Sequence, residues 1–418
     1  MDSDSNWFER IELHEWRQFQ RVEVSLDHRL TVLTGANGSA KTTILNILNR
    51  HFGWNLQLAS TPKKSQKKRM MEYFSDFWGG ESAAEDESPT ADTALVGELV
   101  YSGGDTARLQ VPPSPQQQYS IAIQGQQPVS GIFVSSHRPA VFYQPVTQIP
   151  TALNTREQLL NVYLNDMRGM FSLNYRVQSP VHKIKEGLIS LAVFGYGSEA
   201  VSPNLEARET YEGFQKVLST VLPSELGFKR VRVEVPEVLL ETETGTFPID
   251  SASGGVAAMI DIAWQLHMYS RDHGTFTVVI DEPENHLHPE LQRTFLPSLL
   301  EAFPMTRIVA ATHNPFVVTS VPDSRVYVLE FDDSHHVVSR ELDMVNKAGS
   351  SNEVLRDVLG LESTLPLWAE RQLAEIVHRY AEMDFTDSTV SALRDELATL
   401  GMSETLPSAL GDILEDRE

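Results

Sequence analysis

Cysteine is absent from the 418-residue sequence. Its absence excludes disulfide bonds, cysteine-ligated zinc and catalysis by a thiol. It also fits a reducing compartment, and we expect a cytoplasmic protein. No apolar run approaches the ~20 residues that span a bilayer. The acidic start "MDSDSNWFER" has no apolar segment of a secretory signal, so we expect no membrane partner.

Basic residues are scarce too, with 34 lysines and arginines against 57 acidic residues and a formal net charge of −23. A surface of this charge does not coat nucleic acid indiscriminately. The basic run "PKKSQKKR" (62–69) is interpreted as a solvated face, with a contact to nucleic acid or to a nuclease partner as the alternative. DNA contact is therefore a secondary expectation. The segment 83–92 and the chain from Glu362 onward are acidic.

The order of apolar patterns predicts an α/β fold. Alternating residues up to Gly35 predict short strands that lead into a turn, and "TILNILNRH" predicts a helix directly after it. Strands are also predicted at "GIFVSSHRPAVFY", "FTVVIDE" and "RIVAATH", with helices through 155–222 and at "GGVAAMIDIAWQLHMYSRD". We divide the chain into core residues 1–150 with a polar insert at about 60–127, a helical subdomain at 151–230, further core at 231–345 and an acidic helical tail at 346–418.

The stretch "LTVLTGANGSAKTT" is one residue away from a phosphate-binding P-loop. Gly35 is followed by four residues, then by Ala40 where the pattern has a second glycine, then by Lys41 and Thr42. The backbone N–H groups would surround the phosphates, Lys41 would reach the β- and γ-phosphates, and the Thr42 hydroxyl would bind Mg²⁺. The predicted nucleotide contacts are Gly35, Asn37, Gly38, Ser39, Ala40, Lys41, Thr42 and Thr43. An ordinary strand–turn–helix is the alternative.

Two carboxylates, Asp281 and Glu282, follow the apolar run "FTVVI". Open α/β sheets bind ligands at the carboxyl ends of such strands. Asp281 is suited to support Mg²⁺, and Glu282 is suited to orient and deprotonate the attacking water. The alternative is that the pair only ends a strand.

Two further motifs flank this pair in the chain. Ser253, Gly254 and Gly255 directly precede a long apolar helix, an arrangement that binds anions but is also a simple N-cap. Thr312 and His313 end the strand "RIVAATH", where a lone histidine is often structural.

The order of these motifs resembles that of ABC-type ATPases. "GANGSAKTT", "SGGVAAMIDIAW", "VVIDEPENHLHP" and "VAATHNP" are similar to the SMC, RecF and OLD (overcoming lysogenisation defect) branch of that superfamily. The tail and the segment "VSSHRP" further resemble the ATPase subunits of bacterial anti-phage systems such as Septu and PARIS. The resemblance covers residues 6–55 and 130–335. It implies an ABC-type P-loop head with an inserted helical subdomain, and ATP and Mg²⁺ as cofactors.

The resemblance also implies residue roles. Lys41 and Thr42 would bind nucleotide and metal, Asp281 would support the metal, Glu282 would be the hydrolytic base and His313 would sense the γ-phosphate. Residues 253–255 would serve the nucleotide of a second copy in a head-to-tail dimer, with "NHLH" (285–288) as the D-loop between them. Two weaker assignments are Gln144 as the glutamine that couples the metal to the helical subdomain, and Arg17 as a nucleotide contact.

The effect of Ala40 depends on its backbone. A methyl group matters if φ is positive there, and matters little if the residue already lies in the first helical turn. The other motifs favour a working nucleotide site, with slow turnover as an open consequence.

The leading functional hypothesis is an ATP-hydrolysing regulatory subunit that assembles with copies of itself and controls an effector in anti-phage defence. No Toprim-like strand-Glu and Asp-x-Asp pattern follows His313, so we expect the effector, a nuclease, to act in trans. The alternatives are a RecF-like DNA-repair ATPase and a nucleotide-gated scaffold with little turnover. The long stretch between Thr42 and Ser253 argues against a transporter subunit.

The tail carries thirteen acidic residues and four arginines from Glu362 onward, which favours a protein partner over DNA. Apolar residues recur in it at helical spacing and form a stripe that needs cover. We expect a partner protein or a neighbouring subunit to cover this stripe, with the chain's own ATPase core as the alternative; the stripe includes Leu367, Trp368, Leu373, Ile376 and Val377.

Overall fold

The computed structural model describes most of the chain. The described residues are 6–64, 71–75, 93–112, 116–138, 141–150, 153–171, 179–270, 273–343, 351–361, 363, 365–384 and 386–415. Residues 65–69 of the basic run lie outside these ranges. The acidic segment 83–92 lies outside them entirely. The chain divides into two compact units, residues 1–354 and 355–418.

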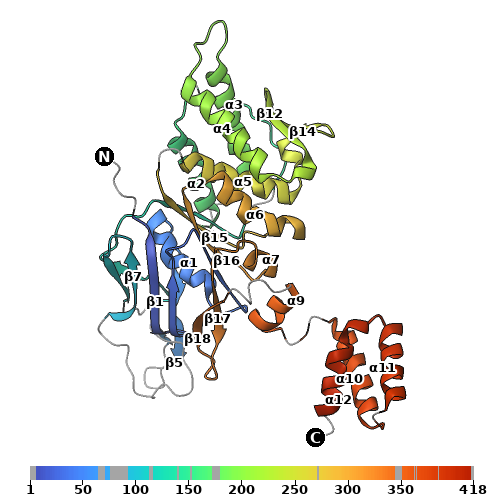
Figure 1. The fold of residues 1–418 in the computed structure, drawn as a ribbon. Helices are drawn as coiled ribbons and strands as arrows, with labels where there is room; N and C mark the ends of the chain where they lie inside the picture. The colour runs from blue at the N-terminus through green and yellow to red at the C-terminus, as the bar shows by residue number, and fades with distance from the viewer. Residues whose placement is uncertain are drawn as a thin grey trace. The chain divides into compact units, whose positions relative to one another are not determined.

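The first unit is built on an eleven-stranded sheet (Figure 1). Its strand order is β10-β8-β7-β1-β2-β18-β17-β3-β16-β15-β11. The bounds, in chain order, are β1 Phe8–Trp16, β2 Phe19–Ser25, β3 Leu30–Gly35, β7 Ala94–Tyr101, β8 Thr106–Val111, β10 Ala122–Gln124, β11 Gly131–Val134, β15 Phe276–Asp281, β16 Thr306–Ala311, β17 Arg325–Phe331 and β18 Val337–Glu341.

The sheet has two halves of different character. From β10 to β2 all pairings are antiparallel, and from β17 to β11 all are parallel. Every residue of β3 and β15 is buried, as expected of parallel strands covered on both faces. Because β3, β15 and β16 run in the same direction, their carboxyl ends meet at one edge, and the predicted motifs follow these ends. The prediction of an α/β fold is confirmed.

Helices cover the parallel half of the sheet. α1 (Lys41–Asn49) follows β3, and α6 (Pro289–Ala302) and α7 (Pro315–Val318) follow β15 and β16. α1 buries Ile44, Leu45, Ile47 and Leu48, the side that the sequence predicted. The short η1 helix (Arg50–Phe52) continues α1, and the small pairs β4 (Leu58–Ala59) with β9 (Gln118–Tyr119) and β5 (Thr61–Lys64) with β6 (Met71–Phe74) lie outside the main sheet.

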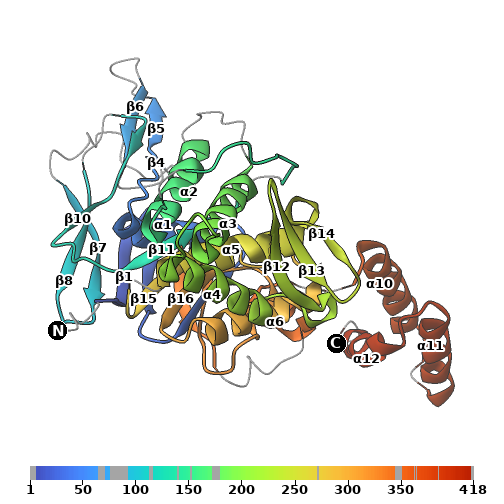
Figure 2. The same ribbon diagram turned by 90° about the horizontal axis from the view of Figure 1, so that it is seen from above.

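A helical lobe stands beside the carboxyl edge of the parallel strands (Figures 1 and 2). It contains α2 (Arg156–Phe171), α3 (Pro180–Tyr196), α4 (Leu205–Val221), η2 (Ser224–Leu226), η3 (Ile249–Ser251) and α5 (Gly254–Ser270). A three-stranded sheet, β12 (Phe228–Glu234), β13 (Glu237–Thr242) and β14 (Thr246–Pro248), flanks it. Residues 255–268 of α5 are all buried, because most of them are apolar and the helix packs against α2, α3, α4 and β11.

The second unit has its own core. Its helices are α10 (Leu367–Ala381), α11 (Asp387–Thr399) and α12 (Leu406–Glu415), with a short turn η5 (Ser403–Thr405). Ile376 and Val377 of α10 share a buried cluster with Leu393, Leu397 and Ile413 of α11 and α12. The stripe predicted in the tail is therefore covered inside the tail, and neither a partner nor the ATPase core is needed to cover it. Trp368 stays largely exposed, at 59%, and Leu373 is partly buried against the same cluster.

Two short elements precede α10 in the chain, α9 (Ser351–Glu353) and a π-helical turn at Val354–Val358. In the described part of the chain, no helix has the length and apolarity that crossing a membrane requires.

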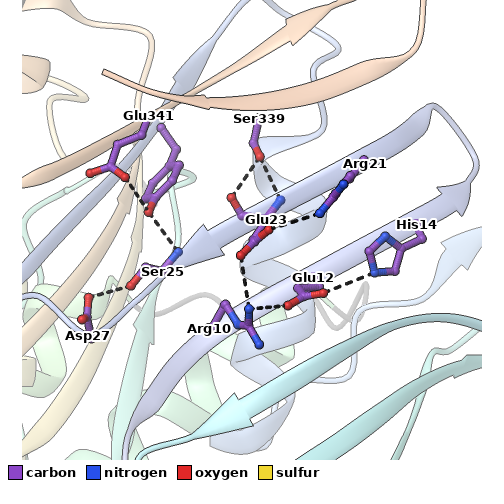
Figure 3. Close-up of polar contacts among 10 residues, drawn as sticks. Arg10, Glu12, His14, Arg21, Glu23, Ser25, Asp27, Ser339 and Glu341 are labelled. Carbon is purple, nitrogen blue, oxygen red and sulfur yellow. Dashed lines mark hydrogen bonds and ion pairs between the residues drawn. The ribbon is translucent and has the colours of Figure 1, made fainter. Parts of the chain in front are cut away.

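The outer face of the antiparallel half carries paired charges (Figure 3). Arg10 Nη1 lies 2.7 Å from Glu12 and 3.2 Å from Glu23, and the Ser339 hydroxyl both donates to and accepts from the Glu23 backbone across β2 and β18. Exposed pairs of this kind contribute only about 0.2–1 kcal/mol each. Because Arg10 is shared between two carboxylates, it offers no ready contact to a phosphate, which weakens the case for DNA on this face.

Candidate functional site

The P-loop connects the end of β3 to the start of α1. Gly35 adopts φ 135°, and a Cβ atom there would lie 2.2 Å from the Leu329 carbonyl oxygen of the neighbouring strand β17, so only glycine fits. Gly38 has φ 87°. Lys41 Nζ donates to the carbonyl oxygens of Gly35 (2.9 Å) and Ala36 (3.1 Å), so the loop closes around the ammonium group.

Ala40 is the N-cap of α1 and lies in the left-handed region, at φ 66° and ψ 29°. Its carbonyl oxygen still accepts from the amides of Thr43 (3.0 Å) and Ile44 (3.3 Å), so the helix begins there. A left-handed conformation costs a residue with a Cβ about 1–2 kcal/mol. The sequence left open whether φ is positive at Ala40. It is positive, so the methyl group affects the loop.

Two of the three predicted metal ligands, Thr42 and Asp281, lie together. Thr42 Oγ1 donates to Asp281 Oδ2 at 3.3 Å, although the two residues come from different ends of the chain. Burial and the neighbouring Glu282 charge raise the pKa of Asp281, whereas hydrogen bonds from Thr42 and Ser136 and the nearby Lys41 charge oppose the rise. A hydroxyl and a carboxylate are ligands that Mg²⁺ accepts, together with phosphate oxygens and water. Within the described residues no three His, Asp or Glu side chains form a metal cluster, so phosphate or water would complete such a site.

Glu282 and His313 also meet at this edge. Glu282 Oε1 lies 3.4 Å from His313 Nδ1, and Glu282 Oε2 accepts from Asn285 Nδ2 at 2.7 Å. The side chains of Glu282 and His313 are 34% and 54% exposed, whereas Asp281 is buried. Glu282 and His313 are therefore accessible to solvent at the carboxyl ends of the parallel strands. The geometry fits a carboxylate that contacts water next to a histidine.

Glu284 is a third carboxylate that sequence reasoning missed. It is buried, its Oε1 accepts from Thr312 Oγ1 at 2.5 Å, and burial raises its pKa. Its position two residues after Glu282 was the available signal. Burial lowers the pKa of Lys41, and the charges of Asp281, Glu282 and Glu284 oppose this shift. These carboxylate charges thus favour the charged form of Lys41 in the P-loop.

The Ser-Gly-Gly motif lies at the exposed N-terminus of α5. Ser253 Oγ accepts from the Val256 amide at 3.4 Å, which is the N-cap arrangement considered from the sequence. A Cβ atom on Gly255 would approach the His286 carbonyl oxygen to 2.9 Å, so the motif packs closely on the predicted D-loop. Among the described residues, no hydrogen bond or ion pair joins 253–255 to the chain's own P-loop.

The Gln144 side chain contacts the backbone just before α3, and its role as a metal ligand stays a prediction. The side-chain oxygen Oε1, the atom that would bind a metal, accepts from the Ser179 amide at 2.8 Å. The backbone carbonyl oxygen of Gln144 accepts from buried Lys185. Ser136 hydrogen-bonds to Asp281 instead, because it follows β11, the strand paired with β15. The segment "VSSHRP" after a buried strand was the sequence signal for this residue.

Arg17 lies in the turn between β1 and β2, with φ 56° and its guanidinium 5.9 Å from the Trp16 ring centroid. Its role as a nucleotide contact stays a prediction. The neighbouring Gln18, which sequence reasoning missed, donates from Nε2 to the Gly38 carbonyl oxygen at 3.5 Å. The turn therefore lies beside the P-loop.

Two family models match the chain. One, described as "AAA domain, putative AbiEii toxin, Type IV TA system", matches residues 165–319, and another, described as "AAA domain", matches residues 10–87. The first match covers the signature motif, the carboxylate pair and His313, and the second covers the P-loop.

Curated relatives come from anti-phage systems. The chain is 26% identical over 165 residues to the Septu protein PtuA of Bacillus thuringiensis, which covers 36% of this chain and 42% of the relative. It is 22% identical over 256 residues to the PtuA of Bacillus mycoides, covering 60% and 33%. It is 25% identical over 134 residues to the "Retron Vc95 probable ATPase" of Vibrio cholerae, covering 31% and 25%. The match thus spans less than half the length of each of these relatives.

Solved structures of SMC heads are distantly similar to the chain. The SMC head domain from Thermotoga maritima is 15% identical, with a TM-score of 0.42 and coverage of 80% of this chain and 99% of that one. This likeness is too distant to carry an argument of its own. An ATPase is supported instead by the motifs, by their meeting at one sheet edge and by the two family matches. The chain thus matches AAA-domain family models and is similar to the Septu protein PtuA and to a probable retron ATPase.

Proposed function

We propose that this chain binds and hydrolyses ATP, and that hydrolysis controls a separate effector protein in anti-phage defence. The observation that carries the proposal is the meeting of the Thr42–Asp281 pair and the Glu282–His313 pair beside Lys41. Three separate segments of the chain place these groups at one edge of the sheet, which is the arrangement that phosphoryl transfer to water requires.

Each residue has a defined task in this proposal. Lys41 exchanges its two backbone carbonyl acceptors for phosphate oxygens, and the backbone amides of the loop bind the remaining phosphate oxygens. Thr42 and Asp281 would hold Mg²⁺, which neutralises charge on the phosphates. Glu282 orients and deprotonates the attacking water, and His313 contacts the γ-phosphate.

A head-to-tail pair of chains would complete the site. Ser253 and Gly254 are exposed at the N-terminus of a 17-residue helix whose partial positive charge favours an anion. Within the chain this motif contacts the D-loop. Its exposed end can therefore contact the nucleotide held by a second copy. We therefore keep the predicted homodimer as part of the proposal.

The effector and the setting follow from the relatives. The matched proteins carry names of the Septu and retron systems, and we extend that role to this chain with a nuclease as the effector in trans. The lack of cysteine supports action in the cytoplasm. Direct binding of duplex DNA has less support, because Arg10 on the open sheet face is paired with carboxylates.

One observation favours a second candidate, a nucleotide-gated scaffold with little turnover. Both carboxylate oxygens of Glu282 already have neighbours, Asn285 and His313, and Ala40 holds a strained conformation. With Glu282 held in this way, ATP hydrolysis would be slow unless assembly of the chains freed the carboxylate.

A phage-challenge experiment tests the defence role. Cells carrying this gene and its neighbouring gene are infected, and protection is compared between the native chain, Lys41→Ala and Lys216→Ala, an exposed lysine on α4 that serves as the matched control. We expect protection to be lost only in Lys41→Ala. Undiminished protection in that variant would show that nucleotide binding is not needed.

A further inference from the structure

The residues after β11 contact the turn that carries Glu282. Arg138 Nη1 donates to the Asn285 carbonyl oxygen at 2.9 Å, and Nη2 donates to the Glu282 carbonyl oxygen at 3.4 Å. Asn285 Nδ2 in turn donates to the Ser136 carbonyl oxygen at 3.2 Å. Three polar contacts thus join the end of β11 to the turn 282–285, which is more than 140 residues later in the chain.

This turn needs outside support. Glu282 and His286 both have positive φ, 48° and 71°. The Asn285 amide donates to the Glu282 carbonyl oxygen at 3.1 Å and closes the turn. Residues with a Cβ hold such conformations only where the surroundings over-determine them. The contacts of Arg138 to both ends of the turn provide this constraint.

Arg138 itself is held between the turn and the helical lobe. It lines a cavity of about 280 Å³ together with Gly254, Ala257, Asp261 and His286. Asp261 of α5 accepts from the buried Tyr163 hydroxyl and adds a negative charge near the guanidinium. Burial lowers the pKa of Arg138, but the nearby carboxylates oppose the shift. A guanidinium stays charged in proteins, and its planar fork can donate to two carbonyls at fixed spacing, which an ammonium group cannot.

We propose that Arg138 is a positioning residue for ATP hydrolysis, which fixes the backbone of the turn 282–285 and thereby aims the Glu282 carboxylate. The proposal rests on Glu282 as the hydrolytic base in the proposed function. Asn285 links the two roles, because its side chain donates to Glu282 Oε2 while Arg138 holds its carbonyl oxygen. The same guanidinium lies beside α5, so it also connects the turn to the helix that begins with the signature motif.

Loss of Arg138 should affect chemistry and spare nucleotide binding. The groups that bind phosphate lie on β3 and α1 and have no hydrogen bond to Arg138 among the described residues. A small displacement of a catalytic group costs about 100-fold in rate. We expect Arg138→Met to lower kcat about 100-fold with KM within about threefold of the native value. Arg138→Lys, which reaches one carbonyl at best, should lower kcat at least about tenfold.

The matched control is Arg156→Met. Arg156 is also a buried arginine, but its guanidinium donates to Thr210 and His267 inside the helical lobe. Steady-state ATPase rates are normalised to the number of ATP-binding sites, so that unfolded protein does not count. Arg156→Met should keep kcat per site within about threefold. Equal kcat losses in Arg156→Met and both Arg138 variants would show a merely structural role and overturn the proposal.

A double variant separates this proposal from the proposed function. In a Glu282→Gln background, Arg138→Met should cause no further loss of hydrolysis, because it acts through Glu282. Additive losses would contradict the proposal. If Glu282→Gln alone abolishes turnover while Arg138→Met keeps kcat within about twofold, only the role of Arg138 fails. If Glu282→Gln keeps full turnover, the base assignment fails, and this inference fails with it.

Discussion

Replacing Ala40 with glycine should relieve backbone strain in the P-loop. Ala40 lies at φ 66° and ψ 29°, where a residue with a Cβ costs about 1–2 kcal/mol relative to its right-handed conformation. Glycine removes this cost but gains freedom in the unfolded chain, which offsets about 0.4–1 kcal/mol. The net expectation is a stabilisation of roughly 0.5–1 kcal/mol.

Ala36 provides the matched control, because it lies in the same loop and is not among the residues with positive φ. Ala36→Gly gains unfolded-state freedom and relieves no strain, so it should destabilise the protein by about 0.4–1 kcal/mol. The two variants therefore differ by more than either differs from the native chain. Urea unfolding of the nucleotide-free protein, followed by tryptophan fluorescence, measures both.

The functional readout accompanies the stability measurement. ATP affinity of Ala40→Gly should equal that of the native chain, and hydrolysis should be equal or faster, since the loop then reaches its conformation without strain. If both glycine variants destabilise the protein alike, Ala40 is not strained in the folded state. If Ala40→Gly abolishes ATP binding, this explanation of the substitution is wrong.

Three further outcomes follow from the structure. Lys41→Ala should abolish ATP binding in calorimetry, because it removes the cation directed at the phosphates; unchanged affinity would refute the assignment. Burial lowers the pKa of His51 from 6.5 to about 4, so its stabilising contribution is present above pH 6.5 and is lost as the pH falls toward 4. Unfolding free energy should drop by about 1.5 kcal/mol from pH 6.5 to 5, and this component should vanish in His51→Gln. A chain ending at Val354 should still bind ATP and stay in solution, because the tail has its own core; aggregation would contradict this separation.

Local spacing in the sequence predicted which side chains would meet at the site. Lys41 and Thr42 come after the buried strand β3, Asp281 ends β15 with Glu282 directly after it, and His313 comes after β16. Parallel strands bring their carboxyl ends to one edge, so motifs that follow such strands are brought together by the fold itself. This is why the α/β fold and the placing of these groups could be predicted without the structure.

Other features depended on contacts between distant segments. The φ of Ala40 could not be read from its residue type, and Arg138 meets Asn285 across 147 residues. Gln144 was a candidate by residue type alone, whereas its side chain bonds to the Ser179 backbone. In the tail, the apolar stripe correctly predicted the burial of Ile376 and Val377 but could not identify the covering surface, which is supplied by α11 and α12.

Glu282→Gln tests the central claim most directly. The amide keeps the shape of the side chain: its oxygen can accept from Asn285, and its nitrogen can donate to His313, but it cannot take a proton from water. ATP binding should persist, hydrolysis should fall by orders of magnitude, and size-exclusion chromatography with ATP should show an ATP-closed dimer. Glu301→Gln, which changes an exposed carboxylate on α6, is the control and should keep turnover within a few-fold. Full ATPase activity in Glu282→Gln would place the catalytic base elsewhere and contradict the account.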